Sequence, residues 1–487
     1  MRTGLTSTVT STPQRPPAQP VTRGAAAGYA VGDLGISIAY FAVGFFFLFY
    51  LTDLVGLSPA VAGTVVLIGK LWDGVNDPLI GILVDRTRSR HGRKRAYLLY
   101  GAIPFAVSFI ALWWLPAGSA STATAVVATL LSLLFATTYS LVGVPYQALV
   151  PVMTTDYDDR TRLVAYKAIA SAIGVIIGGG IALVVTSQAG VEQALRIMAV
   201  GFGIAIAVTV LIAATSTRAH ARFDSVPITP VPLRRYVQLL LEPNVAVLMG
   251  YKVLGAVATG VLTASLPYVA THVVGSTSAS TYALAAYTVT AAALVPLWGR
   301  WSQRIDKRRL ILVSNVCAAG VLLAVGLLAG AGSTMLFIAG AAVLGTVMSA
   351  YLVLPPSLVP DLVDFYEYER GERHEAVFFG LWMTVHQLGL GVAGFVLGLF
   401  LAGFGYEAAA EVQDATAVLG VRLAFALVPG TFLVLAALLL LRYRITRDRL
   451  LAAQAVLAAR GVGASAAGPD GTPPGAAGPP AGTGSPR

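Results

Sequence analysis

The residues best suited to chemistry are two carboxylates, Asp73 and Asp77, inside the apolar stretch 58–84. Their i, i+4 spacing places both on one face of a helix, with Lys70 on the same side. An apolar helix of this length crosses a bilayer, where each carboxylate costs roughly 2.5–3.5 kcal/mol unless it is paired or functional. We interpret the two as a cation site; the alternative is an ion pair with Lys70 that only holds helices together.

The composition is that of a membrane protein. The 487 residues include only 11% charged side chains, and the mean hydropathy is +0.76. These values exclude an ordinary soluble enzyme. The net charge of +10 would suit a nucleic-acid partner, but the positive charges fall in alternate loops, as membrane orientation requires. We therefore expect the lipid bilayer as a partner, and no nucleic acid.

Twelve apolar spans can be placed along the chain. They are residues 27–51, 58–84, 96–116, 122–151, 162–186, 195–215, 244–272, 279–300, 309–330, 333–358, 375–402 and 420–442. An even number of spans puts both termini on one side of the membrane. Arginine and lysine gather in the loops after the even-numbered spans, so the positive-inside rule predicts cytoplasmic termini and a multi-pass protein of the cell membrane, inner or plasma.

A weak internal repeat divides the spans into two halves. Ala148–Pro151 ends the fourth span and Ser357–Pro360 ends the tenth, with similar sequences. Parallel six-helix halves are the plan of major-facilitator transporters, so we predict an all-α membrane fold of this kind. The expected divisions are a cytoplasmic tail 1–26, a half 27–215, a linker 216–243, a half 244–442 and a cytoplasmic tail 443–487. The first tail has no apolar core and is not a cleavable signal peptide. The last tail is largely disordered in this prediction, above all in its Gly/Ala/Pro-rich segment 461–487.

Several motifs occur in a characteristic order. They are Tyr29–Gly35 and Tyr50–Ser58 in the first span, Trp72–Thr87 in the second, Val144–Pro151 in the fourth, Pro360–Tyr368 after the tenth and Phe378–Trp382 in the eleventh. Together they resemble the glycoside–pentoside–hexuronide:cation symporter family, the melibiose-carrier group of the major facilitator superfamily. The resemblance covers nearly the whole membrane domain. It implies cation-coupled symport of a sugar or glycoside by alternating access.

The resemblance also implies a cation site. The family's two helix-2 carboxylates fall on Asp73 and Asp77, its neighbouring amide on Asn76 and a helix-4 hydroxyl on Ser140. Oxygen ligands suit Na⁺ or Li⁺, and a carboxylate can bind H⁺ instead. We expect one of these coupling cations and no other cofactor. Asp73 and Asp77 are metal ligands only if the ion is Na⁺.

The implied substrate site matches the family less well. The acidic residues that bind sugar hydroxyls in the melibiose carrier align with Ser37 and Gly143, and carboxylates are better acceptors than either. The helix-5 cation falls on Lys167, and the helix-11 lysine on Gln387. The expected substrate contacts are Ser37, Tyr40, Lys167, Trp382, His386 and Gln387. The alternative cargo is an amphiphilic, lipid-like or glycosylated natural product.

Charged residues near the cytoplasmic ends of the spans form candidate gates. Asp85, Arg86 and Arg93 surround the turn after the second span. Asp361 and Asp364, in the predicted loop after the tenth span, can pair with cytoplasmic arginines in an outward-open state. The alternative for the first group is membrane topology alone, and for the second a solvated loop.

Other functions have weaker support in the sequence. There is no GxxxxGK[ST] phosphate loop and no metal-ligand cluster, so we do not expect an enzyme. A transport-inactive receptor or scaffold is the alternative from another class. Lys252 lies deep in the seventh span, where we expect it to face a cavity. By analogy with major-facilitator chains, the protein is expected to act as a monomer on a small-molecule substrate.

Overall fold

The computed structural model describes residues 21–154, 157–180, 191–218, 238–371, 375–410 and 412–466. These residues form helices, turns and loops without any strand, which confirms the expected all-α fold. Much of the predicted N-terminal tail, the linker and the C-terminal tail lies outside the described residues, which leave out 1–20, 219–237 and 467–487.

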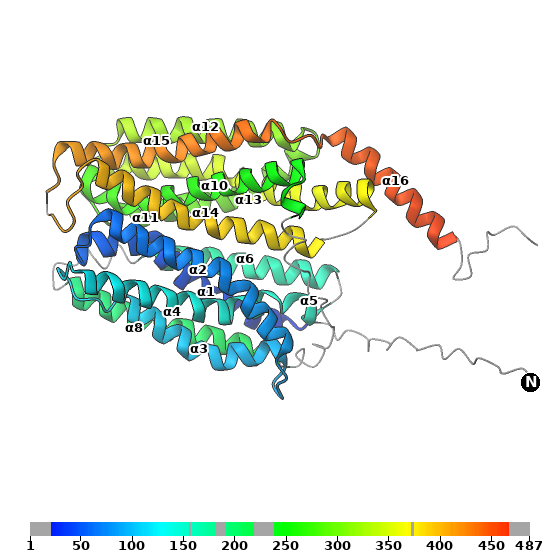
Figure 1. The fold of residues 1–487 in the computed structure, drawn as a ribbon, viewed down its shortest axis with the longest axis horizontal. Coiled ribbons are helices and arrows are strands. Elements are labelled where there is room, and N and C mark those ends of the chain that lie inside the picture. Colours follow the sequence, from blue (N-terminus) through cyan, green and yellow to red (C-terminus); the bar gives the residue numbers. More distant parts are fainter. Residues whose placement is uncertain are drawn as a thin grey trace, which may run out of the picture.

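The first half of the chain forms one layer of the molecule (Figure 1). Its helices are α1 (Arg23–Phe49), α2 (Pro59–Arg86), α3 (Arg93–Leu112), α4 (Thr122–Gln147), the short α5 (Val150–Met153), α6 (Tyr157–Gly179) and α8 (Val191–Ser216), with a π-helical turn η1 (Tyr50–Leu54) continuing α1. The Thr22 side chain caps α1, and the Ser121 side chain caps α4, by accepting hydrogen bonds from backbone N–H groups of the first turn.

The second half forms the other layer. Its helices are α10 (Pro243–Val269), α11 (Ala279–Ser302), α12 (Lys307–Leu328), α13 (Thr334–Arg370), α14 (Glu375–Gly403), α15 (Ala415–Leu440) and α16 (Arg447–Ala466), with a π-helical turn η3 (Ala270–Val274) continuing α10. α1 begins and α15 ends at the same end of the bundle, which we call the terminal end (Figure 1). The opposite end, with η1 and η3, is the distal end.

Eleven described helices are long and apolar enough to cross a membrane. α2 is the twelfth long helix of the bundle and has 28 residues. It is less apolar because it carries Lys70, Asp73 and Asp77, the side chains that make it the candidate cation helix. It packs between α4 of its own half and α14 of the other half.

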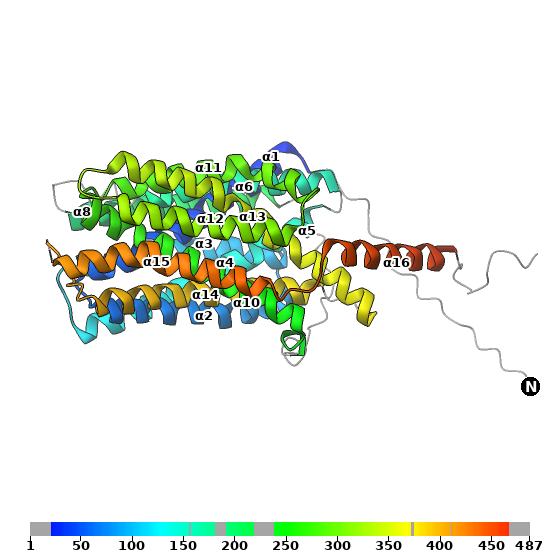
Figure 2. The same cartoon turned by 90° about the horizontal axis from the view of Figure 1, so that it is seen from above.

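The two halves meet along three pairs of helices. α2 lies beside α14, α6 beside α11, and α1 beside α10. The first two pairs lie side by side in both views of the molecule (Figures 1 and 2). Side chains on these six helices are therefore among those that can contact a substrate held between the halves.

Two elements differ from the sequence prediction. α13 continues to Arg370, so Asp361 and Asp364 lie on a helix and not in a loop. This helix ends where Gly371 adopts the left-handed conformation, with φ of 72°. Residues 447–466 form the helix α16 within the segment that the sequence prediction gives as the C-terminal tail. α16 packs against the extended end of α13, where Gln454 Nε2 donates to Asp364 at 2.9 Å.

Candidate cation and substrate sites

α2 places the two carboxylates against different partners. The Asp73 side chain is buried, with 3% of its surface exposed. Asp77 Oδ1 accepts a 2.5 Å hydrogen bond from the Ser140 hydroxyl on α4. The predicted link between the second and fourth spans is therefore present, because α2 packs directly against α4.

Lys70 forms an ion pair with Asp73, the pairing that is the structural alternative to a cation site. Its ammonium lies 2.9 Å from Asp73 Oδ2 and 4.7 Å from the centre of the Tyr40 ring. Asp73 Oδ1 is buried without a hydrogen-bond partner, and so is the side-chain nitrogen of Asn76. A buried carboxylate oxygen without a donor is a suitable ligand for a hard cation. The residues present thus fit a small cation, with Lys70 as its competitor for Asp73.

A polar cavity of about 210 Å³ lies in the first half. Its lining residues are Asp33, Ile36, Ser37, Tyr40, Phe41, Tyr139, Gly143, Tyr146, Gln147, Lys167 and Ser171. Lys167 Nζ lies 3.6 Å from Asp33 Oδ1, and the Ser37 and Ser171 hydroxyls are 2.9 Å apart. The cavity thus brings together Ser37, Tyr40 and Lys167, three of the expected substrate contacts.

Asp33 is not among the substrate contacts expected from the sequence. It lies one helical turn before Ser37 on α1, and the Ser37 hydroxyl donates to it at 3.4 Å. The i, i+4 spacing to Ser37 is the signal that would find it. Asp33 therefore supplies the acidic acceptor that the family alignment leaves out at Ser37. Tyr139 and Ser171 are further lining residues that are identified only by the packing of α4 and α6 on α1.

The remaining expected contacts lie on α14. The Tyr40 hydroxyl donates to Gln387 Oε1 at 3.2 Å, which joins the two halves beside the cavity. Trp382 is 3% exposed and faces Lys252, whose ammonium lies 4.6 Å from the ring centre. His386 lies on α14, and its Nδ1 atom is buried without a hydrogen-bond partner. Trp382 and His386 do not line the 210 Å³ cavity.

Between described residues, the contacts of the candidate gate residues lie within one half of the chain. The Arg93 guanidinium donates to the backbone carbonyl of Asp85 at 3.0 Å, and Arg86 lies in the last turn of α2. Asp361 accepts from Lys307 at 2.6 Å, in place of an arginine of the other half. Among ion pairs between the described side chains, only one joins the two halves, and it lies at the distal end.

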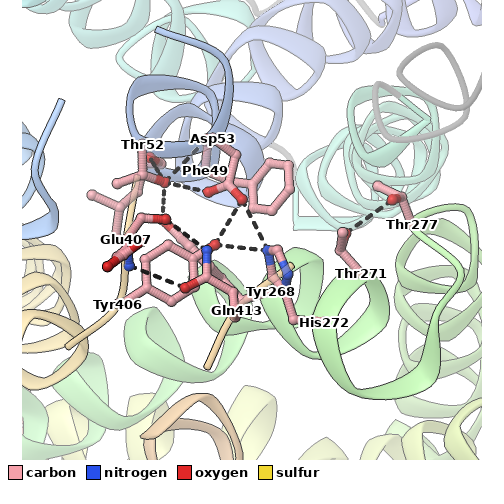
Figure 3. A network of polar contacts seen from close by, with 11 residues as sticks. Phe49, Thr52, Asp53, Tyr268, Thr271, His272, Thr277, Tyr406, Glu407 and Gln413 are labelled. Atoms are coloured by element: carbon pink, nitrogen blue, oxygen red, sulfur yellow. Dashed lines mark hydrogen bonds and ion pairs between the residues drawn. The ribbon is translucent and has the colours of Figure 1, made fainter. Parts of the chain in front are cut away.

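That pair belongs to a buried polar network (Figure 3). His272 Nε2 lies 2.9 Å from Asp53 Oδ1, and the Tyr406 hydroxyl donates to the same oxygen at 2.6 Å. The Thr52 hydroxyl is 2.8 Å from that of Tyr268. Burial raises the pKa of the Tyr406 phenol, which therefore keeps the proton that it donates. The network holds η1 of the first half against η3 and the α14–α15 connection of the second.

Asp53 is part of a motif that the sequence indicated, but its partners are distant in the chain. Asp53, His272 and Tyr406 come from three separate segments, and nothing in their spacing suggests contact. Their contacts join the two halves at the distal end of the molecule. This fold and these sites are those of a multi-pass membrane transporter, with two helical halves and a polar cavity in the first of them.

Comparisons with known proteins agree with that class. The family model described as "MFS/sugar transport protein" matches residues 28–447. The putative glycoside/cation symporter YagG of Escherichia coli strain K12 is 27% identical over 87% of this chain and 92% of that protein. The sodium-dependent lysophosphatidylcholine symporter 1 of Gallus gallus is 25% identical over 86% of each chain. A bacterial homologue of the human lysosomal transporter Spinster superposes with a TM-score of 0.64, at 14% identity, over 87% of this chain and 98% of that one.

The chain belongs to the MFS/sugar transport protein family. This confirms the resemblance to glycoside–pentoside–hexuronide:cation symporters that the motifs indicate. The members matched here are transporters and not enzymes.

Proposed function

We propose that the protein is a cation-coupled symporter of a small hydroxylated solute, a sugar or glycoside, that works by alternating access. The observation that carries the proposal is the polar cavity of about 210 Å³, lined by the Asp33–Lys167 ion pair and by hydroxyl groups. Hydroxyl groups of a sugar both donate and accept, so they match a lining that offers carboxylate, ammonium and hydroxyl side by side.

Cation coupling is supported by the side chains of α2. Asp73 and Asp77 belong to α2, which packs against α14, the helix that carries the Gln387 contact to Tyr40. Tyr40 lines the cavity and also lies under the Lys70 ammonium. When Na⁺, Li⁺ or H⁺ binds Asp73, it displaces Lys70. That movement changes the contact between Lys70 and Tyr40. Because Tyr40 also lines the cavity, binding at the cation site and binding in the cavity can affect each other.

The contacts between the halves at the distal end support alternating access. With the terminal end in the cytoplasm, as the positive-inside pattern favours, they correspond in our proposal to a state closed to the outside. In our proposal the Asp53–His272–Tyr406 network separates when the cavity opens outward. Asp361 and the arginines near Arg93 then meet at the cytoplasmic end.

A transport assay in proteoliposomes tests the proposal. Uptake of a labelled glycoside should rise when a gradient of Na⁺, Li⁺ or H⁺ is imposed, and soluble sugars should inhibit it. The ion whose gradient raises uptake is the coupling ion. Binding of glycosides without gradient-driven uptake would instead indicate a transport-inactive receptor.

An amphiphilic cargo is the second candidate, because one relative is named a lysophosphatidylcholine symporter. The polar lining of the cavity argues against it. An apolar cavity between α10, α11, α12, α13 and α15 has a volume of about 30 Å³, room for about one water molecule and not for an acyl chain. Inhibition of uptake by acylated compounds alone, with no effect of sugars, would favour this candidate.

A further inference from the structure

Lys70 belongs to the same stretch of α2 as the two candidate cation ligands. Its ammonium lies 2.9 Å from Asp73 Oδ2, and only 16% of the Lys70 side chain and 4% of the Asp73 side chain are exposed. Asp77 instead accepts a hydrogen bond from the neutral Ser140 hydroxyl. We call Lys70, Asp73 and Asp77 the α2 cluster. With all three side chains ionised, two carboxylates and one ammonium give the α2 cluster one net negative charge.

The helices packed around the α2 cluster contribute neutral polar groups. α4 provides the Ser140 hydroxyl, and α1 provides Tyr40, whose ring centre lies 4.7 Å from the Lys70 ammonium. α14 provides Gln387, which accepts from the Tyr40 hydroxyl at 3.2 Å. Among the ion pairs between side chains that the structure describes, only Lys70–Asp73 involves the α2 cluster. One negative charge of the α2 cluster is therefore left for a ligand to balance.

The Lys70 ammonium can remain in the site when an ion binds Asp73. Besides Asp73 it contacts the face of the Tyr40 ring, and cation–π attraction stabilises an ammonium at this distance. Asp73 Oδ1 is buried without a hydrogen-bond partner, so this oxygen is available to an ion while Oδ2 still contacts Lys70. The positive charge of Lys70 thus counts toward the charge balance both before and after an ion binds.

We propose that Lys70 is the residue that restricts the α2 site to one monovalent cation. One Na⁺ or Li⁺ brings the net charge of the α2 cluster to zero. A Ca²⁺ or Mg²⁺ ion, or a second Na⁺, would leave an uncompensated positive charge where the dielectric constant is low. Two carboxylates without an ammonium would instead suit a divalent ion, which prefers several charged oxygen ligands. This inference rests on the proposed cation coupling and names the residue that sets its ion selectivity and stoichiometry.

Ion binding to the purified full-length protein in choline chloride buffer tests the proposal. Calorimetric titration should show one Na⁺ or Li⁺ per protein, and an equal concentration of Ca²⁺ or Mg²⁺ should change that affinity less than about twofold. Lys70→Met should increase the affinity for Ca²⁺ or Mg²⁺ by about tenfold or more, because the net charge becomes −2. Lys70→Arg should retain the preference for monovalent ions.

The matched control removes a buried ammonium from the other half. Lys252 is 7% exposed, and its ammonium lies 4.6 Å from the centre of the Trp382 ring. It forms no ion pair with a carboxylate of the residues that the structure describes. Lys252→Met should therefore leave the preference for monovalent ions unchanged.

A second pair of variants tests the charge balance without leaving a buried carboxylate unpaired. Lys70→Met alone removes the partner of Asp73, which destabilises the folded chain. Asp73→Asn brings the net charge to zero and should abolish binding of Na⁺ and Li⁺. Adding Lys70→Met to Asp73→Asn returns the net charge to −1 and should restore monovalent binding to within about tenfold of the unmodified protein.

The outcomes separate this inference from the proposed function. If Lys70→Met has a lower melting temperature but an unchanged ion preference, and the double variant recovers no binding, Lys70 is structural and the inference is wrong. Equal affinity of the unmodified protein for Na⁺ and Ca²⁺ also overturns it. If no variant binds Na⁺ or Li⁺ while a proton gradient drives uptake, the inference fails and cation-coupled transport stands. If no cation gradient drives uptake, the proposed function fails as well.

Discussion

At the scale of single residues, the two carboxylates of α2 have different surroundings and should respond differently to substitution. Asp73 has one oxygen on Lys70 and one without a partner, whereas Asp77 is bonded to Ser140. We therefore expect Asp73 to be the more direct cation ligand, and Asp77 to complete the site from the next turn.

Neutralising either carboxylate should abolish cation-driven accumulation. Asp73→Asn and Asp77→Asn each remove a hard-cation ligand but also lower the desolvation cost of the helix, so membrane insertion should survive. Accumulation in proteoliposomes should fall roughly tenfold or more, the factor that corresponds to about 1.4 kcal/mol. Asp448→Asn, at an exposed position of α16, serves as the control. If both α2 variants accumulate substrate normally, these carboxylates have a structural role and do not bind the coupling cation.

The ion pair of the polar cavity should contribute to substrate affinity. Lys167→Ala should weaken binding by roughly 10- to 100-fold, because one charged hydrogen bond is worth about 1.5–3 kcal/mol. Asp33→Asn should weaken it as well, since the two groups lie 3.6 Å apart. Calorimetric titration of the purified variants measures both effects. Unchanged affinity in both variants, with normal expression, would exclude this cavity as the substrate site.

At the scale of elements, we expect the junction of η1 with η3 and the α14–α15 connection to determine which end of the molecule is closed. Buried hydrogen bonds join Asp53 of the first half to His272 and Tyr406 of the second. The Asp53–His272 contact is the one ion pair between described side chains that links the two halves. Charged hydrogen bonds of this kind are worth about 1.5–3 kcal/mol each. This is enough to shift an equilibrium between two states of similar free energy.

Removing the imidazole should therefore open the distal end. In a Cys317→Ser background, spin labels at Ala120 and Ser276 report the distance between the distal loops of the two halves. His272→Ala should shift that distribution to longer distances. Thr271→Ala is the matched control, because its hydroxyl bonds to Thr277 within one half, at 2.9 Å. Identical distributions for His272→Ala and the unmodified protein would contradict a gating role.

At the scale of the whole molecule, the orientation of the chain in the membrane can be tested directly. Ser89 follows α2 at the terminal end, and Ser276 follows η3 at the distal end. In the Cys317→Ser background, an impermeant thiol reagent applied outside intact cells should label a cysteine at Ser276 and not one at Ser89. Labelling of both positions from outside would contradict the twelve-span topology, and the reverse pattern would place the termini outside.

The sequence by itself determined the class of protein. Apolar spans of bilayer length dictate helices, because a backbone in lipid must satisfy its hydrogen bonds within each segment. The candidate cation ligands can also be identified from the sequence. Asp73 and Asp77 lie four residues apart on one helix, so their shared face follows from local geometry. The same local rule applies to Asp33 and Ser37, although only Ser37 was indicated by the family alignment.

Only the tertiary structure decided which side chains meet. Asp53 with His272, Tyr40 with Gln387, and Lys252 with Trp382 are contacts between helices far apart in the chain. Helical periodicity determines the face on which a residue lies, but the rotation and depth of each helix depend on packing against its neighbours. That no carboxylate among the described residues forms an ion pair with Lys252 is likewise a property of the packed helices, since charges from any segment could have met it there.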